Sequence, residues 1–229
     1  METEKKLKKK TKIKVIPVLI ALFLILIIGG IIYYLLSLPI ANIYIKGNNY
    51  LTDQEIIEQA KIENYPSFIE TTKYRIKKRL LNNDYISEVN VKKKFFNTIV
   101  ITVKEYNILF RKDENKNIVL ENGTELNDNN KYSVPILLNY VPDTKYKSFL
   151  KHMNRINESV KSEISEIRYY PNEQDDDRFL LHMNDGNLVY LTLTKFSQIN
   201  YYDDVLDQLE GKKGILYLDS GNHFKVMEN

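Results

Sequence analysis

The most informative absence in this 229-residue sequence is cysteine, which does not occur at all. No disulfide, thiolate metal ligand or cysteine nucleophile is therefore available, so any exported part must be stabilised by burial and backbone pairing. Glycine occurs only eight times. So few glycines leave little material for a phosphate-binding loop, and no serine nucleophile elbow is present.

Histidine is also scarce. The three histidines, His152, His182 and His223, fall in different predicted elements, and none has the HExxH or paired spacing of a zinc site. The run at residues 175–177, three aspartates, lacks the alternating ligands and distal Glu of a calcium loop, so we interpret it as a solvated hairpin tip. Carboxylates that pair only in space are invisible in a sequence. Apart from catalysis by such a carboxylate pair, which stays open, we predict a protein that is not an enzyme and needs no metal or cofactor.

Charged residues are missing between Lys14 and Lys46, and most of that stretch is continuously apolar. A helix needs ~20 residues to cross a hydrocarbon core of ~30 Å, and residues 15–38 are long enough to do so. A cleaved signal peptide has a shorter apolar core and a small-residue cleavage site, and a buried soluble helix would show a polar face. We therefore predict a transmembrane helix over residues 15–38.

Lysine is concentrated before this helix. Residues 1–14 hold seven lysines and two glutamates, a net charge of +5, whereas the whole chain carries +3, so the remainder is slightly acidic at −2. Because lysine-rich flanks stay in the cytoplasm, residues 1–14 are predicted to be a cytoplasmic basic stub, with the later domains outside. The stub can also attract anionic lipid, at ~1 kcal/mol per nearby lysine, although orientation alone is the simpler account.

The chain beyond the membrane begins with a strand and a helix. Residues 43–45 alternate like a short strand, and Gly47 and Asn48 supply the turn that follows it. Thr52 and Glu55 then match a capping box, in which each side chain satisfies an orphan amide of the other residue's backbone. A helix is predicted to start at this box.

A second helix is predicted from about residue 71 to 81, followed by the stretch VNVKKKFFNTIVITVKE at residues 89–105. Lysines beside phenylalanines are typical of a surface that binds single-stranded nucleic acid. Apolar residues also alternate through the stretch, as they do in a β-hairpin. Because nucleic acid is not an expected partner outside a membrane, we interpret the stretch as scaffold. The predicted inner face consists of Val89, Val91, Ile99, Ile101 and Val103. Phe95 and Phe96, at the turn, are either a hydrophobic cap over the helices or an exposed contact near the membrane and a partner.

The remaining chain forms a mixed, β-rich module over residues 109–224, followed by a short tail at residues 225–229. Apolar stripes predict helices over residues 146–160 and from about residue 196 to 209, with short strands around them. Residues 40–108 have the order strand, helix, helix, strand, strand. The predicted fold class is therefore α+β, with a transmembrane helix, a β-α-α-β-β domain and a β-rich domain.

Three features together resemble the FtsQ/DivIB family of bacterial division proteins. They are the single span with its short basic stub, the segment VNVKKKFFNTIVITVKEYNILF, and the entry IKGNNYLTDQEI. The family's entry signature, a hydrophobic residue before Gly-Asn and then a helix, is matched by Ile45, Gly47, Asn48 and Glu55-Ile56. The resemblance implies that residues 40–108 form a POTRA domain and that residues 109–224 form the family's β domain.

The same resemblance implies a non-catalytic scaffold at the division septum. Members of this family join two small single-span proteins, FtsL and DivIC (also called FtsB), and help to regulate the septal peptidoglycan synthases. Contact is expected by strand addition at an exposed sheet edge of the β domain, where main-chain hydrogen bonds provide pairing and alternate side chains provide selectivity. The residues of this chain expected to take part are Tyr217, Asp219, Phe224 and Val226.

Two alternatives remain open from the sequence. Phe224 and Val226 would equally serve ordinary core closure of a terminal hairpin. For the function, the competing interpretation is a membrane-anchored, POTRA-containing chaperone, sensor or cell-wall-binding module unrelated to division.

Overall fold

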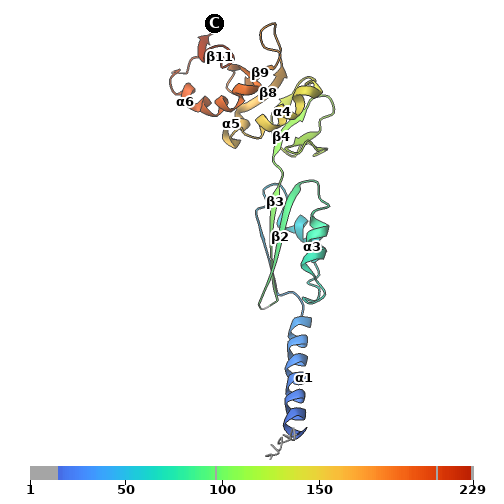
Figure 1. Cartoon of the computed structure of the whole chain (residues 1–229). Coiled ribbons are helices and arrows are strands. Elements are labelled where there is room, and N and C mark those ends of the chain that lie inside the picture. The colour runs from blue at the N-terminus through green and yellow to red at the C-terminus, as the bar shows by residue number, and fades with distance from the viewer. Residues whose placement is uncertain (1–14, 96, 210, 228–229) are drawn as a thin grey trace, which may run out of the picture. The chain divides into compact units, whose positions relative to one another are not determined.

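The computed structural model describes residues 15–95, 97–209 and 211–227 of the chain. The chain divides into two compact units, Met1–Lys104 and Glu105–Asn229, and each unit has its own hydrophobic core. Figure 1 traces the elements of both units along the chain. The stub predicted for residues 1–14 lies outside the described residues, and so does Phe96.

Helix α1, Val15–Ser37, is the apolar segment predicted to cross a membrane. Its 23 residues rise ~1.5 Å each, which gives about 35 Å and exceeds a hydrocarbon core of ~30 Å. The helix is apolar on all sides and none of its residues is buried, as expected for a surface that faces lipid. Within the described part of the chain, it is the one helix with this length and composition.

The rest of the first unit is a three-stranded sheet with two helices (Figure 1). The strands lie in the order β1-β3-β2, and β1 runs parallel to β3. In chain order the elements are β1 Asn42–Lys46, α2 Asp53–Ala60, α3 Lys73–Leu80, β2 Ile86–Lys94 and β3 Thr98–Glu105. This is the predicted order of strands and helices, so the α+β class is confirmed for this unit.

Apolar side chains between the helices and the sheet form the core of the first unit. The five predicted inner-face residues of the hairpin are all buried: Val89, Val91, Ile99, Ile101 and Val103. They pack against Ile56 and Ala60 of α2 and against Ile76 and Leu80 of α3. The alternation seen in the sequence therefore does mark the buried face of the sheet.

Two local features fix the entry from β1 into α2. The hydroxyl of Thr52 accepts a hydrogen bond from the Glu55 N–H (3.2 Å), and the Glu55 carboxylate accepts one from the Thr52 N–H (2.6 Å), which is the predicted capping box. Gly47 has a φ of +82°, and a Cβ there would lie 2.2 Å from the carbonyl oxygen of Val103. A side chain at position 47 would therefore push the chain after β1 away from β3.

The second unit is built on a nine-stranded sheet in the order β12-β11-β10-β9-β8-β7-β4-β5-β6. The strands are β4 Ile108–Lys112, β5 Ile118–Leu120, β6 Glu125–Leu126, β7 Ile136–Leu137, β8 Ile164–Tyr169, β9 Arg178–Met183, β10 Leu188–Thr192, β11 Gly214–Tyr217 and β12 His223–Val226. The helices are α4 Asp143–Met153, α5 Glu158–Glu163, the 3-10 helix η1 Leu193–Tyr201 and α6 Tyr202–Leu206.

Aromatic packing organises the core of this unit. The ring of Phe149 on α4 stacks on Phe179 of β9 with 4.9 Å between centroids, and Phe196 of η1 meets it edge-on at 5.8 Å. Such offset and edge arrangements add specific stabilisation to the area that the rings bury. The helix η1 is thereby fixed on the same face of the sheet as α4.

The two long helices predicted for this unit are wrong in detail. Residues 146–160 form parts of two helices, because α4 ends at Met153 and α5 begins at Glu158. Between them the Asn200 side chain accepts a hydrogen bond from the Asn157 N–H (2.8 Å) and donates one to the Arg155 carbonyl (3.0 Å). These bonds hold the backbone in the break. Residues 196–209 likewise divide into the end of η1 and the short helix α6.

Candidate partner-binding edge

Strand β12 lies at one edge of the nine-stranded sheet and pairs only with β11 in the described sheet. The pairing is antiparallel, with Leu216 opposite Phe224 and Tyr217 opposite His223. An edge strand exposes a row of backbone donors and acceptors to which another chain can add. Of the predicted residues, Phe224 and Val226 lie on this edge strand, whereas Tyr217 lies on β11, which pairs on both sides, and Asp219 follows the end of β11.

The register shows which backbone groups of β12 face outward. The Met227 N–H donates to the Lys213 carbonyl at 3.0 Å, and bonded pairs recur at every second residue of an antiparallel ladder. The backbone of Lys225 therefore faces β11. The N–H and C=O groups of Phe224 and Val226, which alternate with it, point toward the open edge.

The side chain of Phe224 covers the backbone of β11. A Cβ built on Gly214 would lie 2.7 Å from the ring of Phe224 and 2.2 Å from the Lys225 carbonyl oxygen, so the ring occupies space that only glycine leaves open. Phe224 is partly buried against the core of the unit, whereas Val226 is 46% exposed. Phe224 thus closes the core at the edge, which agrees with the alternative of ordinary core closure by a terminal hairpin. The side chain of Val226 faces solvent.

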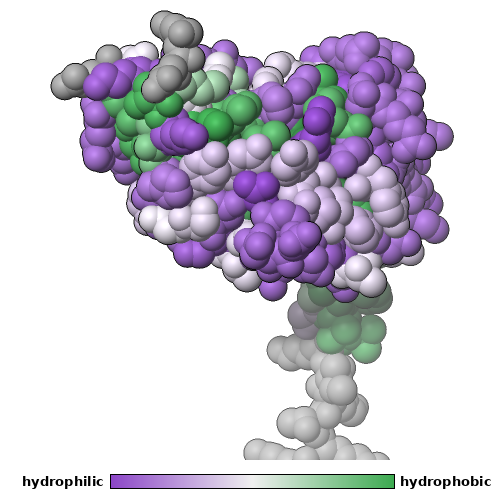
Figure 2. All heavy atoms as spheres, turned by 90° about the horizontal axis from the view of Figure 1, so that it is seen from above, coloured by the Kyte–Doolittle hydropathy of each residue, from purple (hydrophilic) through white to green (hydrophobic). Residues whose placement is uncertain are grey.

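A groove lies beside β12 on the side of the sheet that carries α6. It has a volume of about 470 Å³. Apolar side chains dominate its lining, which includes Tyr201, Val205, Leu209, Leu216, Leu218 and Phe224. Figure 2 shows hydrophobic surface (green) on this unit among hydrophilic residues (purple). A strand added to β12 would direct every second side chain to the same face of the sheet as this groove.

A buried polar network supports the floor of the groove. The hydroxyl of Tyr202 donates to the Asp185 carboxylate and accepts from the Asn187 side-chain amide, both at 2.9 Å. The Asn187 amide oxygen in turn accepts from the Gly214 N–H at 2.8 Å. Burial raises the pKa of Tyr202 far above its ordinary value, so the hydroxyl stays protonated as a donor. This network ties α6 to the start of β11.

Aromatic side chains cover the opposite face of the last strands. The rings of Tyr190, Tyr217 and His223 form a ladder, with centroids 5.4 Å apart for the first pair and 4.8 Å for the second. The guanidinium carbon of Arg178 lies 3.7 Å from the Tyr190 centroid, and its Nε lies 2.6 Å from the Asp219 carboxylate. Asp219 follows the end of β11, and only 4% of its side chain is exposed beside Arg178. Its predicted partner contact stays a prediction.

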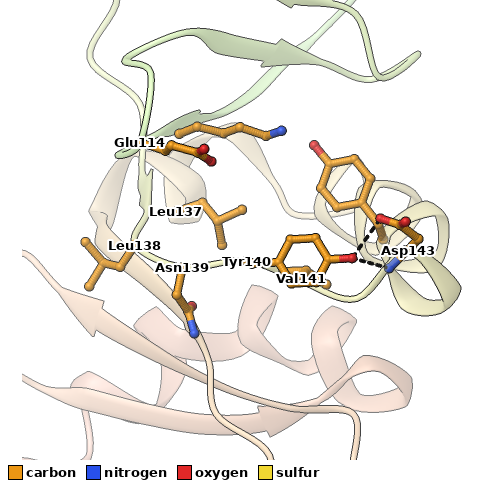
Figure 3. Close-up of a pocket in the computed structure, with 9 residues that line it drawn as sticks. Glu114, Leu137, Leu138, Asn139, Tyr140, Val141 and Asp143 are labelled. Carbon is orange, nitrogen blue, oxygen red and sulfur yellow. Dashed lines mark hydrogen bonds between the residues drawn. The ribbon is translucent and has the colours of Figure 1, made fainter.

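A second hollow of this unit, about 280 Å³ in volume, lies beside the start of α4 (Figure 3). The Tyr140 hydroxyl donates to the Asp143 carboxylate at 2.9 Å and accepts from its N–H at 3.2 Å. Lys112 forms an ion pair with Glu125, which offsets burial and leaves the pKa of Lys112 raised. These polar groups are bonded to one another, whereas the buried Tyr146 hydroxyl that also lines the hollow has no hydrogen-bond partner in the part of the chain that the structure describes. Among the described residues, no group of three or more His, Asp or Glu side chains has a metal-binding arrangement.

The predicted turn residues of the first unit have separate roles. The Asn48 side chain donates to the Leu51 carbonyl and to the Asp53 carboxylate, each at 2.9 Å, and so holds the loop that leads into α2. Phe95 is 91% exposed. The alternative of a hydrophobic cap over the helices is therefore wrong for Phe95, and the alternative of an exposed contact remains.

Sequence reasoning missed two residues of the edge. Gly214 and Asn187 were not predicted as site residues, yet the first makes room for Phe224 and the second holds the start of β11. Asp185-Gly186, a turn signal just before Asn187, is a local clue only to a hairpin. No local signal marks Gly214, because its importance comes from Phe224 and Lys225 on the neighbouring strand.

Comparison with known proteins agrees with this architecture. A family model described as "POTRA domain, FtsQ-type" matches residues 38–106. The chain is 30% identical over 230 residues to the cell division protein DivIB of Bacillus subtilis (strain 168), covering 96% of this chain and 88% of that protein. It is 29% identical over 232 residues to the cell division protein DivIB of Bacillus anthracis, covering 98% and 87%.

A solved structure of the major extracytoplasmic domain of DivIB from Geobacillus stearothermophilus, in its trans isomer, also resembles this chain. It shares 23% sequence identity, covers 47% of this chain and 96% of that chain, and has a TM-score of 0.39. A likeness at this level carries no further argument.

The fold and the family model first define a class, that of α+β proteins with an N-terminal apolar helix of membrane-spanning length and an FtsQ-type POTRA domain. The identity to the Bacillus subtilis protein extends over nearly the whole of both chains. The chain belongs to the DivIB family of cell division proteins, and the resemblance inferred from its entry motif is confirmed.

Proposed function

We propose that this chain is a non-catalytic scaffold of the bacterial division complex. Helix α1 anchors it in the cell membrane, with the N-terminus in the cytoplasm and the later domains outside, at the division septum. The proposed partners are FtsL-like and DivIC/FtsB-like single-span proteins, and through them the septal peptidoglycan synthases. No cofactor takes part. The family membership supports the role in division, and the lysine-rich N-terminal segment supports the orientation.

The open edge of β12 carries the proposal for partner binding. The backbone groups of Phe224 and Val226 point outward there, and an apolar groove of about 470 Å³ lies beside the same strand. An added strand would gain main-chain hydrogen bonds from the edge and side-chain selectivity from the groove. We propose that an extended segment of the DivIC-like partner binds in this way.

Co-purification from a reconstituted membrane tests strand addition. Val226→Pro removes an outward-facing N–H without breaking a bond to β11, since proline is tolerated on an edge strand where its nitrogen faces solvent. The matched control Val226→Thr keeps the N–H and a β-branched side chain. We expect Val226→Pro to lose capture of the DivIC-like protein and Val226→Thr to retain it. Unchanged capture by Val226→Pro would mean that the partner does not pair with this edge.

A fluorescent fusion of the whole chain tests the cellular role separately. A ring at midcell in dividing cells is the expected distribution. Uniform label over the envelope would favour the competing sensor or wall-binding role, whatever the outcome of the co-purification.

A further inference from the structure

The β2–β3 hairpin of the first unit has an exposed aromatic residue at its tip. Phe95 is 91% exposed, more than any large apolar residue of helix α1, where Ile16 reaches 72%. Single exposed apolar residues are ordinary on soluble surfaces and need no special role. The position of Phe95 therefore decides what its exposure means.

The tip lies at the membrane end of the sheet. Helix α1 ends at Ser37, β1 begins shortly afterwards at Asn42, and Asn42 pairs in parallel with Thr98, the first residue of β3. The chain that enters β1 comes directly from α1. Consequently, the turn before Thr98 lies at the end of the sheet from which α1 departs.

Hydrogen bonds order the short connection between α1 and the sheet. The Ala41 N–H donates to the Asn97 carbonyl at 2.9 Å, and the Asn97 side-chain amide donates to the Pro39 carbonyl at 3.2 Å. The Phe68 N–H donates to the Leu38 carbonyl at 3.0 Å. Asn97 adopts a φ of +50°, which asparagine tolerates better than most residues. The hairpin tip is thus attached to the chain where it leaves the helix.

An apolar hollow of about 1270 Å³ continues from the tip to the last turns of α1. Its lining includes Ile32, Leu35 and Leu36 of the helix together with Phe68, Lys94 and Phe95. The three helix residues of this lining belong to the surface of α1, an apolar helix of membrane-spanning length. Lipid, which surrounds such a helix, is therefore the occupant that reaches the hollow without any additional partner.

Charge and aromatic residues around the hollow match a membrane interface. Lys92 and Lys94 are exposed on β2, whereas the Lys93 amine donates a hydrogen bond to the Phe68 carbonyl. Tyr33 and Tyr34 are exposed near the end of α1. Aromatic rings lie at headgroup level at the ends of membrane spans, and lysines extend their amines toward phosphates there.

We propose that the tip of the β2–β3 hairpin lies in the interfacial layer of the outer leaflet. The ring of Phe95 contacts the upper acyl chains, and Lys92 and Lys94 contact the phosphates of anionic phospholipids. The hairpin thereby gives the first unit a second attachment beside α1. The proposal requires α1 to span the bilayer, but it does not depend on partner binding at β12.

Tryptophan fluorescence of the full-length chain in vesicles tests this placement. The chain contains no tryptophan, so Phe95→Trp introduces a single reporter at an exposed position. The control is Glu88→Trp, also exposed, seven residues back along β2 and about 23 Å away at ~3.3 Å per strand residue. We expect lipids brominated near the headgroup to quench Phe95→Trp severalfold more than Glu88→Trp. Equal, weak quenching of both variants overturns the proposal.

The lysines are tested in the same vesicles. The double change Lys92→Gln with Lys94→Gln, added to Phe95→Trp, is expected to reduce quenching in vesicles rich in phosphatidylglycerol. At high salt, the chain with both lysines is expected to be quenched no more than the double variant, because salt screens the charges. Quenching that is unchanged by the double substitution overturns the phosphate contact. Protection of the reporter only after a division partner is added overturns lipid as the occupant. Capture at β12 is expected to be normal in all these variants, which separates this test from that of the proposed function.

Discussion

The ring of Phe224 on β12 lies where a side chain on Gly214 of β11 would have to be. A Cβ at position 214 would come within 2.7 Å of the ring and within 2.2 Å of the Lys225 carbonyl oxygen. The outermost strand of the second unit is therefore seated by an aromatic residue over a glycine, a pairing in which the ring shields backbone that glycine leaves bare.

Gly214→Ala is expected to loosen this edge. Overpacking of a tight site costs ~1–3 kcal/mol, and here the obstacle is backbone, which cannot rotate away. Hydrogen exchange of the β12 amides measures the effect, with faster exchange expected in the variant. Lys212→Ala, two residues away and exposed, is the control and should exchange like the parent chain; equal protection in both variants would contradict the role of Gly214.

Asp219→Ala is expected to destabilise the second unit. The Arg178–Asp219 ion pair has side chains only 10% and 4% exposed, and removal of one partner from such a pair costs ~3 kcal/mol because the other charge is left buried. Urea unfolding followed by the fluorescence of the tyrosines measures the loss. Asp113→Ala, which breaks the exposed pair with Lys116, should cost less than ~1 kcal/mol. If both variants lose a similarly small free energy of unfolding, the buried pair stabilises the unit no more than the exposed pair does.

Glu163 should contribute a loss of stability to the second unit as the pH rises above about 4.5, the ordinary pKa of its carboxyl group. Burial and the neighbouring Asp203 raise the pKa of Glu163 in the folded chain. The folded state then binds more protons than the unfolded state, so this contribution is complete below the ordinary pKa and is lost as the pH passes the raised one. Glu163→Gln should flatten that decline in urea midpoints measured across the range, whereas Glu173→Gln in an exposed loop should leave it unchanged. A decline that persists in Glu163→Gln would assign it to another group.

Asp128 should have the opposite effect on pH dependence. Its carboxylate forms a buried pair with Arg111, whose hydrogen bond lowers the pKa of Asp128 below its ordinary value of 3.8. That stabilisation is present above pH 3.8 and is lost as the pH falls through the lowered pKa. Asp128→Asn should therefore cost ~3 kcal/mol at neutral pH and show a shallower loss on acidification. If acid sensitivity is the same in both chains, the pair is not the cause.

Local chemistry explains which features the sequence could predict. The capping box of Thr52 and Glu55 lies within four residues, and the buried face of the β2–β3 hairpin follows from alternation alone. The break between α4 and α5 was missed because Asn200, which holds it, is 43 positions from Asn157. An apolar stripe at helical spacing continues across the break, so periodicity gives no sign of it.

The candidate site was predictable to a smaller extent. Alternation placed Phe224 and Val226 on a terminal strand, but only the register shows that their backbone groups face the open edge. The sequence did not distinguish Asp219 as an internal residue, because its partner Arg178 is 41 positions away. Exposure of Phe95 was likewise undecided, since an apolar side chain at a turn fits a cap as well as a contact.

The parallel pairing of β1 with β3 also has a mechanical consequence. The chain enters β1 from the membrane helix and leaves the first unit through the far end of β3. A pull between the membrane and the second unit would therefore draw these two strands past each other along their length. The bonds from Asn42 to Lys46 would then be loaded together in shear rather than opened one at a time, so the first unit would resist such a pull without its strands separating pair by pair.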